Sequence, residues 1–114
     1  MDMVGGDIVT LRVGTVGYPM AFMFAAASSE TANDGSIPFG STITGVAVTV
    51  AAYGGGDISA DVIGTAVVSG AGLQVDVTFK YSTTAKKGIC VTLLKLTLST
   101  GAVITKRWDG LKIE

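Results

Sequence analysis

The segment LQVDVTFKY, residues 73–81, alternates apolar and polar side chains without a break. Successive side chains of a β-strand point to opposite faces, so one face of this segment is apolar and the other is polar. Such alternation is typical of an antiparallel sheet with one buried face and one face in water. We therefore expect residues 73–81 to form a half-buried strand of an all-β fold.

Most of the remaining chain repeats this pattern in short runs that are separated by turn residues. Clusters such as Asn33-Asp34-Gly35 and Gly54–Asp57 lie between apolar runs of strand length. The other expected strands are Asp7–Val13, Tyr18–Ala26, a strand from Gly45 through Val50, Val62–Val68, Ile89–Leu98, Ala102–Trp108 and Leu111–Ile113. Seven or eight short strands in 114 residues predict one domain, residues 1–114, built as an antiparallel β-sandwich or a small barrel.

Two of the expected strands have irregular patterns. Gly64 interrupts the β-branched run Val62–Val68, which indicates a weak edge strand or a bulge. In Ile89–Leu98 the apolar residues change phase at Leu93-Leu94, and we expect a bulge at that point.

Composition excludes several kinds of chemistry. The chain contains no His, which removes His-based triads and imidazole metal ligands. Its single cysteine, Cys90, cannot form an internal disulfide and is expected to be a small core residue. No phosphate-binding glycine loop of the G-x-x-x-x-G-K-[ST] type occurs. We expect a protein that is not an enzyme and has no cofactor.

The charges are few and unevenly distributed. Charged residues make up 15% of the chain, against about 25% in a typical domain, and we expect a partner to cover part of the surface. Residues 1–79 carry one basic and seven acidic side chains, whereas residues 80–114 carry seven basic and two acidic ones. This asymmetry indicates either complementary docking surfaces or, if strands of both halves interleave, charges that mix in the fold.

The segment around Asn33-Asp34-Gly35 has two interpretations. Glu30, Asn33 and Asp34 offer side-chain oxygens of the kind that calcium prefers, and they are the candidate metal ligands. The same residues suit a turn, because Asn, Asp and Gly tolerate positive φ and form local hydrogen bonds. The spacing does not match an EF-hand loop, and the turn is the favoured interpretation.

The candidate contact residues are Val62 and Val68 at the ends of an edge strand, and Lys86 and Lys87 in a basic loop. Expected partners are other protein chains of an assembly, including further copies of this chain. Neither nucleic acid nor a membrane is expected, because the net charge is −1 and no apolar run is long enough to span a bilayer. Val13–Ala27 imitates a signal peptide, but its glycines and Pro19 favour a strand, so secretion is not expected.

Residues 30–108 resemble a known group of proteins. The runs NDGSIPFGSTITGVAVTV, DISADV, LQVDVTFKY and LTLSTGAVITKRW are similar to those of small immunoglobulin-like proteins from phage and prophage structural-gene clusters. This resemblance implies an immunoglobulin-like sandwich without a disulfide, in a structural or adhesion part of a virion or tail. It implies a location in the virion or in the cytoplasm of a bacterial host. The alternative is a calcium- or carbohydrate-binding β-sandwich module.

Overall fold

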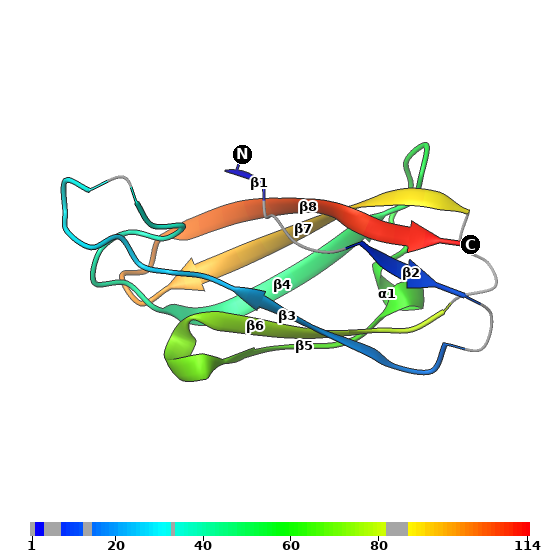
Figure 1. Ribbon diagram of the computed structural model, residues 1–114, viewed down its shortest axis with the longest axis horizontal. Coiled ribbons are helices and arrows are strands. Elements are labelled where there is room, and N and C mark those ends of the chain that lie inside the picture. Colours follow the sequence, from blue (N-terminus) through cyan, green and yellow to red (C-terminus); the bar gives the residue numbers. More distant parts are fainter. Residues whose placement is uncertain (1, 4–7, 13–14, 33, 82–86) are drawn as a thin grey trace.

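Two β-sheets stacked against each other form the protein (Figure 1). The computed structural model describes the 114 residues apart from 1, 4–7, 13–14, 33 and 82–86. The strands are β1 (Asp2–Met3), β2 (Val9–Leu11), β3 (Tyr18–Met23), β4 (Ile43–Ala51), β5 (Ile63–Ser69), β6 (Gln74–Phe79), β7 (Gly88–Leu98) and β8 (Val103–Ile113). The all-β class, the two-sheet arrangement and the near absence of helix are confirmed.

The larger sheet has five strands in the order β1-β8-β7-β4, with β2 also paired to β8. β4, β7 and β8 pair in antiparallel directions, but β1 and β2 run parallel to β8. The prediction of a purely antiparallel fold is therefore wrong for these two strands. Val9 pairs with Leu111 from the opposite end of the chain, so no tight turn forces the antiparallel direction.

The smaller sheet has the order β3-β6-β5 and is entirely antiparallel. β6 is its central strand, and its side chains alternate as the sequence predicts, with Val75, Val77 and Phe79 buried. β5 is an edge strand whose register shifts between Ile63 and Thr65, at Gly64. The sequence offered an edge strand or a bulge as alternatives, and the structure has both an edge position and a register shift at this glycine.

The phase change predicted in β7 is wrong. Alternation continues unbroken along this strand, and the side chains that face the core are those of Cys90, Thr92, Leu94, Leu96 and Leu98. The irregularity lies in the neighbouring strand, because one residue of β7 between Cys90 and Thr92 faces two residues of β8 between Trp108 and Leu111. Apolar side chains at Ile89, Val91 and Leu93 therefore lie on the outer face, which makes both faces of β7 partly apolar.

Two short helical segments join strands and were not predicted. α1 (Ser59–Val62) precedes β5, and the 3-10 turn η1 (Gly70–Gly72) follows it. The Ser59 hydroxyl accepts a hydrogen bond from the backbone N–H of Val50, which attaches α1 to the end of β4. Four residues carry too little apolar periodicity to indicate a helix in a sequence.

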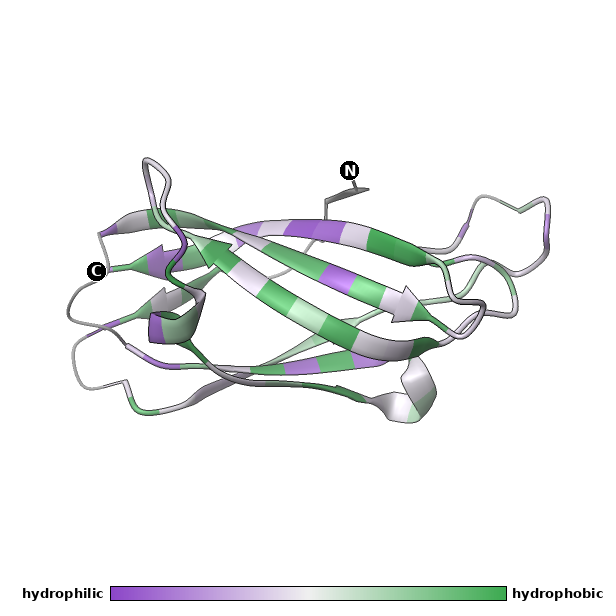
Figure 2. Cartoon of the chain, turned by 180° about the vertical axis from the view of Figure 1, so that it is seen from behind, coloured by the Kyte–Doolittle hydropathy of each residue, from purple (hydrophilic) through white to green (hydrophobic). Residues whose placement is uncertain are grey.

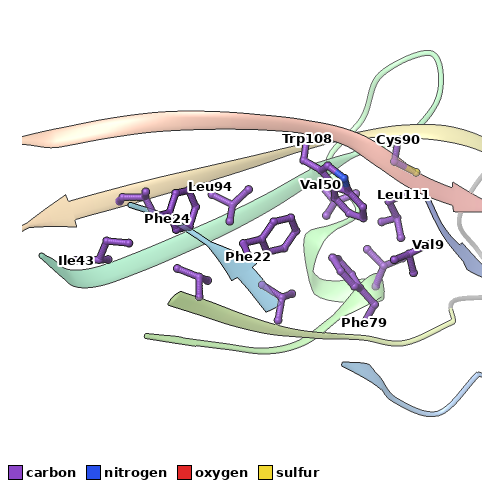
Figure 3. Packing of buried hydrophobic residues seen from close by; sticks show 14 of the residues in the cluster. Val9, Phe22, Phe24, Ile43, Val50, Phe79, Cys90, Leu94, Trp108 and Leu111 are labelled. Atoms are coloured by element: carbon purple, nitrogen blue, oxygen red, sulfur yellow. The ribbon is translucent and has the colours of Figure 1, made fainter. Parts of the chain in front are cut away.

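The core lies between the sheets and centres on Trp108 of β8 (Figure 3). Phe22 of β3 and Phe79 of β6 reach Trp108 from the opposite sheet, with ring centroids 5.1 and 5.9 Å from the indole. Cys90 is buried in this cluster, as expected from the sequence. Gly110 lies against the indole so closely that an added Cβ would be 2.3 Å from Nε1 of Trp108.

Candidate functional site

Most charged residues of the strands lie in the larger sheet, where the basic Arg107 also pairs with the acidic Asp109 at 2.9 Å. β7 and β8 both belong to the larger sheet, which carries the exposed or half-buried charges of Lys95, Arg107 and Lys112. The strands of the smaller sheet carry one charged side chain, Asp76, which accepts hydrogen bonds from Ser69 and Gln74. Strands from both halves of the chain do interleave in the larger sheet, but this interleaving does not spread the basic residues over the molecule.

One side of the molecule is formed by the edges of two strands, β4 and β5, which approach each other near η1 and diverge toward α1 (Figure 2). We call this surface the β4–β5 flank; it consists of Ile43–Ala51 and Ile63–Ser69. Within the described chain, the ladder of β4 is with β7, and segment 57–59 also bonds to its last residues through the Ala51–Asp57 bridge and the Val50 hydrogen bonds to Ile58 and Ser59. β5 pairs only with β6. No ladder of hydrogen bonds joins β4 to β5, because they belong to different sheets. Each strand therefore ends its sheet on this side.

The β4–β5 flank has no charged side chain. Residues 35–56 and 62–75, which include both strands completely, contain no Asp, Glu, Lys or Arg. Figure 2 shows β4 in green and white, the colours of apolar and neutral residues. Open strand edges are usually protected by charges, proline or a covering segment, because their free N–H and C=O groups can pair with another chain. The opposite edge strand, β3, contains Pro19; β5 contains neither proline nor a charge.

The side chains that β5 presents to solvent differ from those predicted. Val62 lies in α1 and is 0% exposed, so the expectation that its side chain contacts a partner is wrong. Val68 packs against the core and is only partly accessible. The exposed residues of the strand are Gly64, Thr65 and Val67. Thr65 and Val67 alternate with Ala66 and Val68, and Val67 is 53% exposed. Side chains of a strand alternate between its two faces, so with Val68 facing the core, Val67 must face outward.

The loop around Asp34 is closed by local hydrogen bonds. One carboxylate oxygen of Asp34 accepts from the backbone N–H of Ser28 at 3.0 Å, and the other accepts from the Ser28 hydroxyl at 2.6 Å. These hydrogen bonds, that of the hydroxyl first, lower the pKa of Asp34. Gly35 packs on the backbone of Ala27, where an added Cβ would be 2.2 Å from the nitrogen. Gly35 is thus required because its backbone lies close to that of Ala27. The sequence suggested a different reason, a positive φ.

The proposed calcium ligands are only partly described. Glu30 is exposed, both oxygens of Asp34 are engaged by Ser28, and Asn33 lies outside the described residues. No group of three or more acidic or cysteine side chains in the described part of the chain is arranged to hold a metal ion. The geometry assigns Asp34 a role in closing the loop, and calcium binding stays an untested prediction.

Of the remaining candidates, only Lys87 is described, and β7, which follows it, begins at the opposite end of the molecule from this loop (Figure 1). Lys87 is exposed just before β7, and Lys86 lies outside the described residues. Burial raises the pKa of the nearby Cys90 thiol, which keeps the thiol protonated and weakly reactive.

Neither of two shallow depressions on the surface contains a pair of titratable groups. One, of about 250 Å³, is lined by Thr49, Val50, Ala51, Gly56, Asp57, Val91 and Leu93. The other, of about 300 Å³, lies between Ala27–Pro38 and the Ile104–Lys106 part of β8. Each contains one charged side chain, Asp57 or Lys106, and the Asp57 carboxylate accepts hydrogen bonds from Ser59. General acid–base catalysis by a carboxylate pair needs two acids facing each other, and neither depression provides them.

Searches of protein-family models, curated proteins and solved structures found no match to this chain. None of the helices in the described residues has the length and apolar character needed to cross a membrane.

Proposed function

We propose that the protein is a non-enzymatic structural module that joins other protein chains through its β4–β5 flank. The observation that carries this proposal is the absence of any charged side chain from the open edge of β5 and from β4 beside it, whose edge is open except at Val50 and Ala51. A soluble monomer gains from charges at such edges, because they prevent pairing with other chains. A chain that uses the edge for assembly must leave it uncharged.

The mode of contact is strand addition at β5. An extended segment of the partner pairs with the main chain of β5, and its side chains lie beside Thr65 and Val67 on the outer face. Main-chain hydrogen bonds supply affinity in this mode, and alternate side chains supply specificity. β5 offers seven residues for pairing, of which three are β-branched valine or isoleucine and one is threonine.

The assembly to which the module belongs is, in this proposal, a phage-like particle. The support is the resemblance of residues 30–108 to small immunoglobulin-like proteins of phage structural-gene clusters, together with the sandwich-like architecture. The immunoglobulin-like strand arrangement and a location in the virion or host cytoplasm belong to the same proposal. Genes for capsid or tail proteins next to the gene for this chain would support it, and neighbours of unrelated function would count against it.

A pair of matched substitutions tests the role of the flank. Val67→Lys places a charge beside the open edge of β5, and Val103→Lys makes the same change on β8; the two valines are 53% and 51% exposed. We expect Val67→Lys to weaken concentration-dependent association by about tenfold or more, because pairing must then desolvate a charge. Val103→Lys should associate like the wild type. Sedimentation velocity over a concentration series measures both.

The outcome against the proposal is equally specific. A wild-type protein that stays monomeric at the highest soluble concentration, or equal weakening by both substitutions, would contradict a contact role for the flank. Calcium or carbohydrate binding is the alternative, and a melting temperature that rises with added calcium would favour it, because a ligand of the folded state stabilises that state.

A further inference from the structure

We infer that the partner at the flank is a second copy of this chain, with the two β5 strands paired antiparallel across a two-fold axis. This inference rests on the proposed function and specifies its partner and geometry. In an isologous dimer the same surface patch is used by both copies, so one self-compatible strand edge is sufficient. β5 meets this condition because none of its residues carries a charge that would face an identical charge.

The charges beyond the two ends of β5 select the antiparallel direction. Before the strand lie Asp57, next to α1, and Asp61, on α1; the exposed Lys80 bonds through its backbone N–H to Val62 at the same end, which leaves this end net negative. The residues after the strand, Gly70–Gly72 of η1, are uncharged. Antiparallel pairing places the α1 end of one copy beside the η1 end of its partner, so carboxylates meet neutral residues. Parallel pairing would place α1 beside α1 and bring like charges together, which is unfavourable.

The second sheet contributes to the same contact. β4 belongs to the other sheet and lies on the same side of the molecule, close to β5 near η1 (Figure 2). A two-fold axis that runs through both sheets at the flank therefore brings β4 of one copy toward β4 of the other while the β5 strands pair. Neither strand carries a charged side chain, and the edge of β4 is open except at Val50 and Ala51, where segment 57–59 bonds to it.

The flank is large enough for a stable dimer. β4 has nine residues, which at about 3.3 Å per residue extend about 30 Å. Two sheets about 10 Å apart, with their outer side chains, make the flank about 20 Å wide. A contact of these dimensions buries about 600 Å² on each copy, or about 1,200 Å² in total, which reaches the range of specific interfaces.

Disulfide trapping tests this geometry. Thr65→Cys and Val67→Cys are made separately, and each variant is oxidised mildly alone and as a mixture with the other. Residues that face each other across an antiparallel pair lie on the same face of the sheet, so a two-fold axis near the middle of β5 must pass through residue 65, 66 or 67. An axis through residue 65 places residue 65 of one copy opposite residue 65 of the other, and an axis through residue 67 does the same for residue 67. An axis through residue 66 places residue 65 opposite residue 67. Each arrangement has the spacing that a disulfide needs.

If the axis passes through Ala66, we expect a covalent dimer only in the mixture, linking one variant to the other. If it passes through residue 65 or 67, one single variant should link to itself, alone and in the mixture, and the other should not. The wild type should form no dimer under the same conditions, because Cys90 is buried, and Val103→Cys serves as an exposed control on β8. Self-linking by both single variants would show parallel pairing and overturn the inference.

The failure of this inference is distinguishable from that of the proposed function. If no combination forms a dimer while the wild type still associates and Val67→Lys weakens that association, the flank is a contact surface but the symmetric pairing is wrong. If the wild type does not associate at all, both are wrong. Far-UV circular dichroism of each variant confirms that the sheets are retained, so a lack of cross-linking counts against the pairing.

Discussion

The indole of Trp108 on β8 meets the ring of Phe22 on β3 edge to face, with centroids 5.1 Å apart and ring planes at 77°. The two residues belong to different sheets, so this contact connects the sheet that carries the basic residues to the sheet that contains β5. Aromatic pairs in this arrangement contribute about 0.5–1.5 kcal/mol beyond the burial of their area. The position of β5 relative to β4 depends on contacts of this kind across the core.

Phe22→Ala should destabilise the fold strongly. Phe22 is 1% exposed, and its truncation leaves a cavity beside Trp108 that costs about 3–5 kcal/mol. Urea unfolding followed by the fluorescence of Trp108, the single tryptophan of the chain, measures the change. Phe39→Ala removes a ring that is 50% exposed and should cost much less; similar losses for both variants would contradict the assigned core.

Gly110→Ala should destabilise the protein because there is no room for a methyl group beside Trp108. The new Cβ would be 2.3 Å from Nε1 of the indole, so either the ring or the irregular part of β8 must move, at a cost of about 1–3 kcal/mol. Gly45→Ala is the matched control, since its Cβ would lie 3.7 Å from the nearest atom, on Thr97. Equal melting temperatures for the two variants would show that a methyl group fits at position 110, contrary to the structure.

Thr92→Val should stabilise the protein. Thr92 is 0% exposed, and its hydroxyl oxygen has no hydrogen-bond partner among the described residues. An unpaired buried hydroxyl costs about 1–3 kcal/mol, and valine has nearly the same shape without that group. Thermal unfolding should show a higher melting temperature for Thr92→Val and little change for Thr97→Val on the exposed face of β7. A lower melting temperature for Thr92→Val would indicate a hydrogen bond that this structure lacks.

Acid should destabilise the loop that contains Asp34. The Ser28 hydroxyl and backbone N–H lower the pKa of this carboxyl in the folded protein, so the charged form contributes stability above the ordinary value of about 3.9. That contribution is lost as the pH falls through the lowered folded pKa. Ser28→Ala should therefore show a smaller fall in melting temperature between about pH 5 and pH 2.5 than the wild type.

Ser99→Ala is the control for the acid experiment. Its hydroxyl accepts a hydrogen bond from the backbone N–H of Thr42 and contacts no carboxylate, so its pH dependence should follow that of the wild type. An unchanged pH dependence in Ser28→Ala would contradict the role assigned to the Asp34–Ser28 pair. Asp57 and Asp76 have pKa values lowered by Ser59 and by Ser69 with Gln74, so some acid sensitivity remains in all three proteins.

The parts of the fold that were predicted correctly depend on local alternation. β6 follows period two from Gln74 to Phe79, because a central strand with one buried face must alternate. β7 was misread because it is apolar on both faces, and the alternation of Ile89, Val91 and Leu93 is as regular as that of the residues that enter the core. A sequence gives no means of choosing between two apolar faces of one strand.

The edge strand that we propose as the contact surface was predicted from the sequence, but its exposed residues were not. Gly64 and the β-branched run identified the edge strand correctly, whereas Val62 was assigned to the surface because the short helix α1 has no recognisable pattern. The parallel pairing of β2 with β8 depends on contacts between the two ends of the chain. Long-range pairings of this kind leave no local signal in either segment.

Amide hydrogen exchange of β5 tests the role of the flank most directly. Exchange is measured on the wild type in dilute and in concentrated solution, with β3, the opposite edge of the same sheet, as the internal reference. We predict that amides of Ile63–Ser69 exchange more slowly in the concentrated sample while those of Tyr18–Met23 do not change, because association covers only the β5 edge. Slower exchange in β3 with no change in β5, or the same rates at both concentrations, would contradict the account.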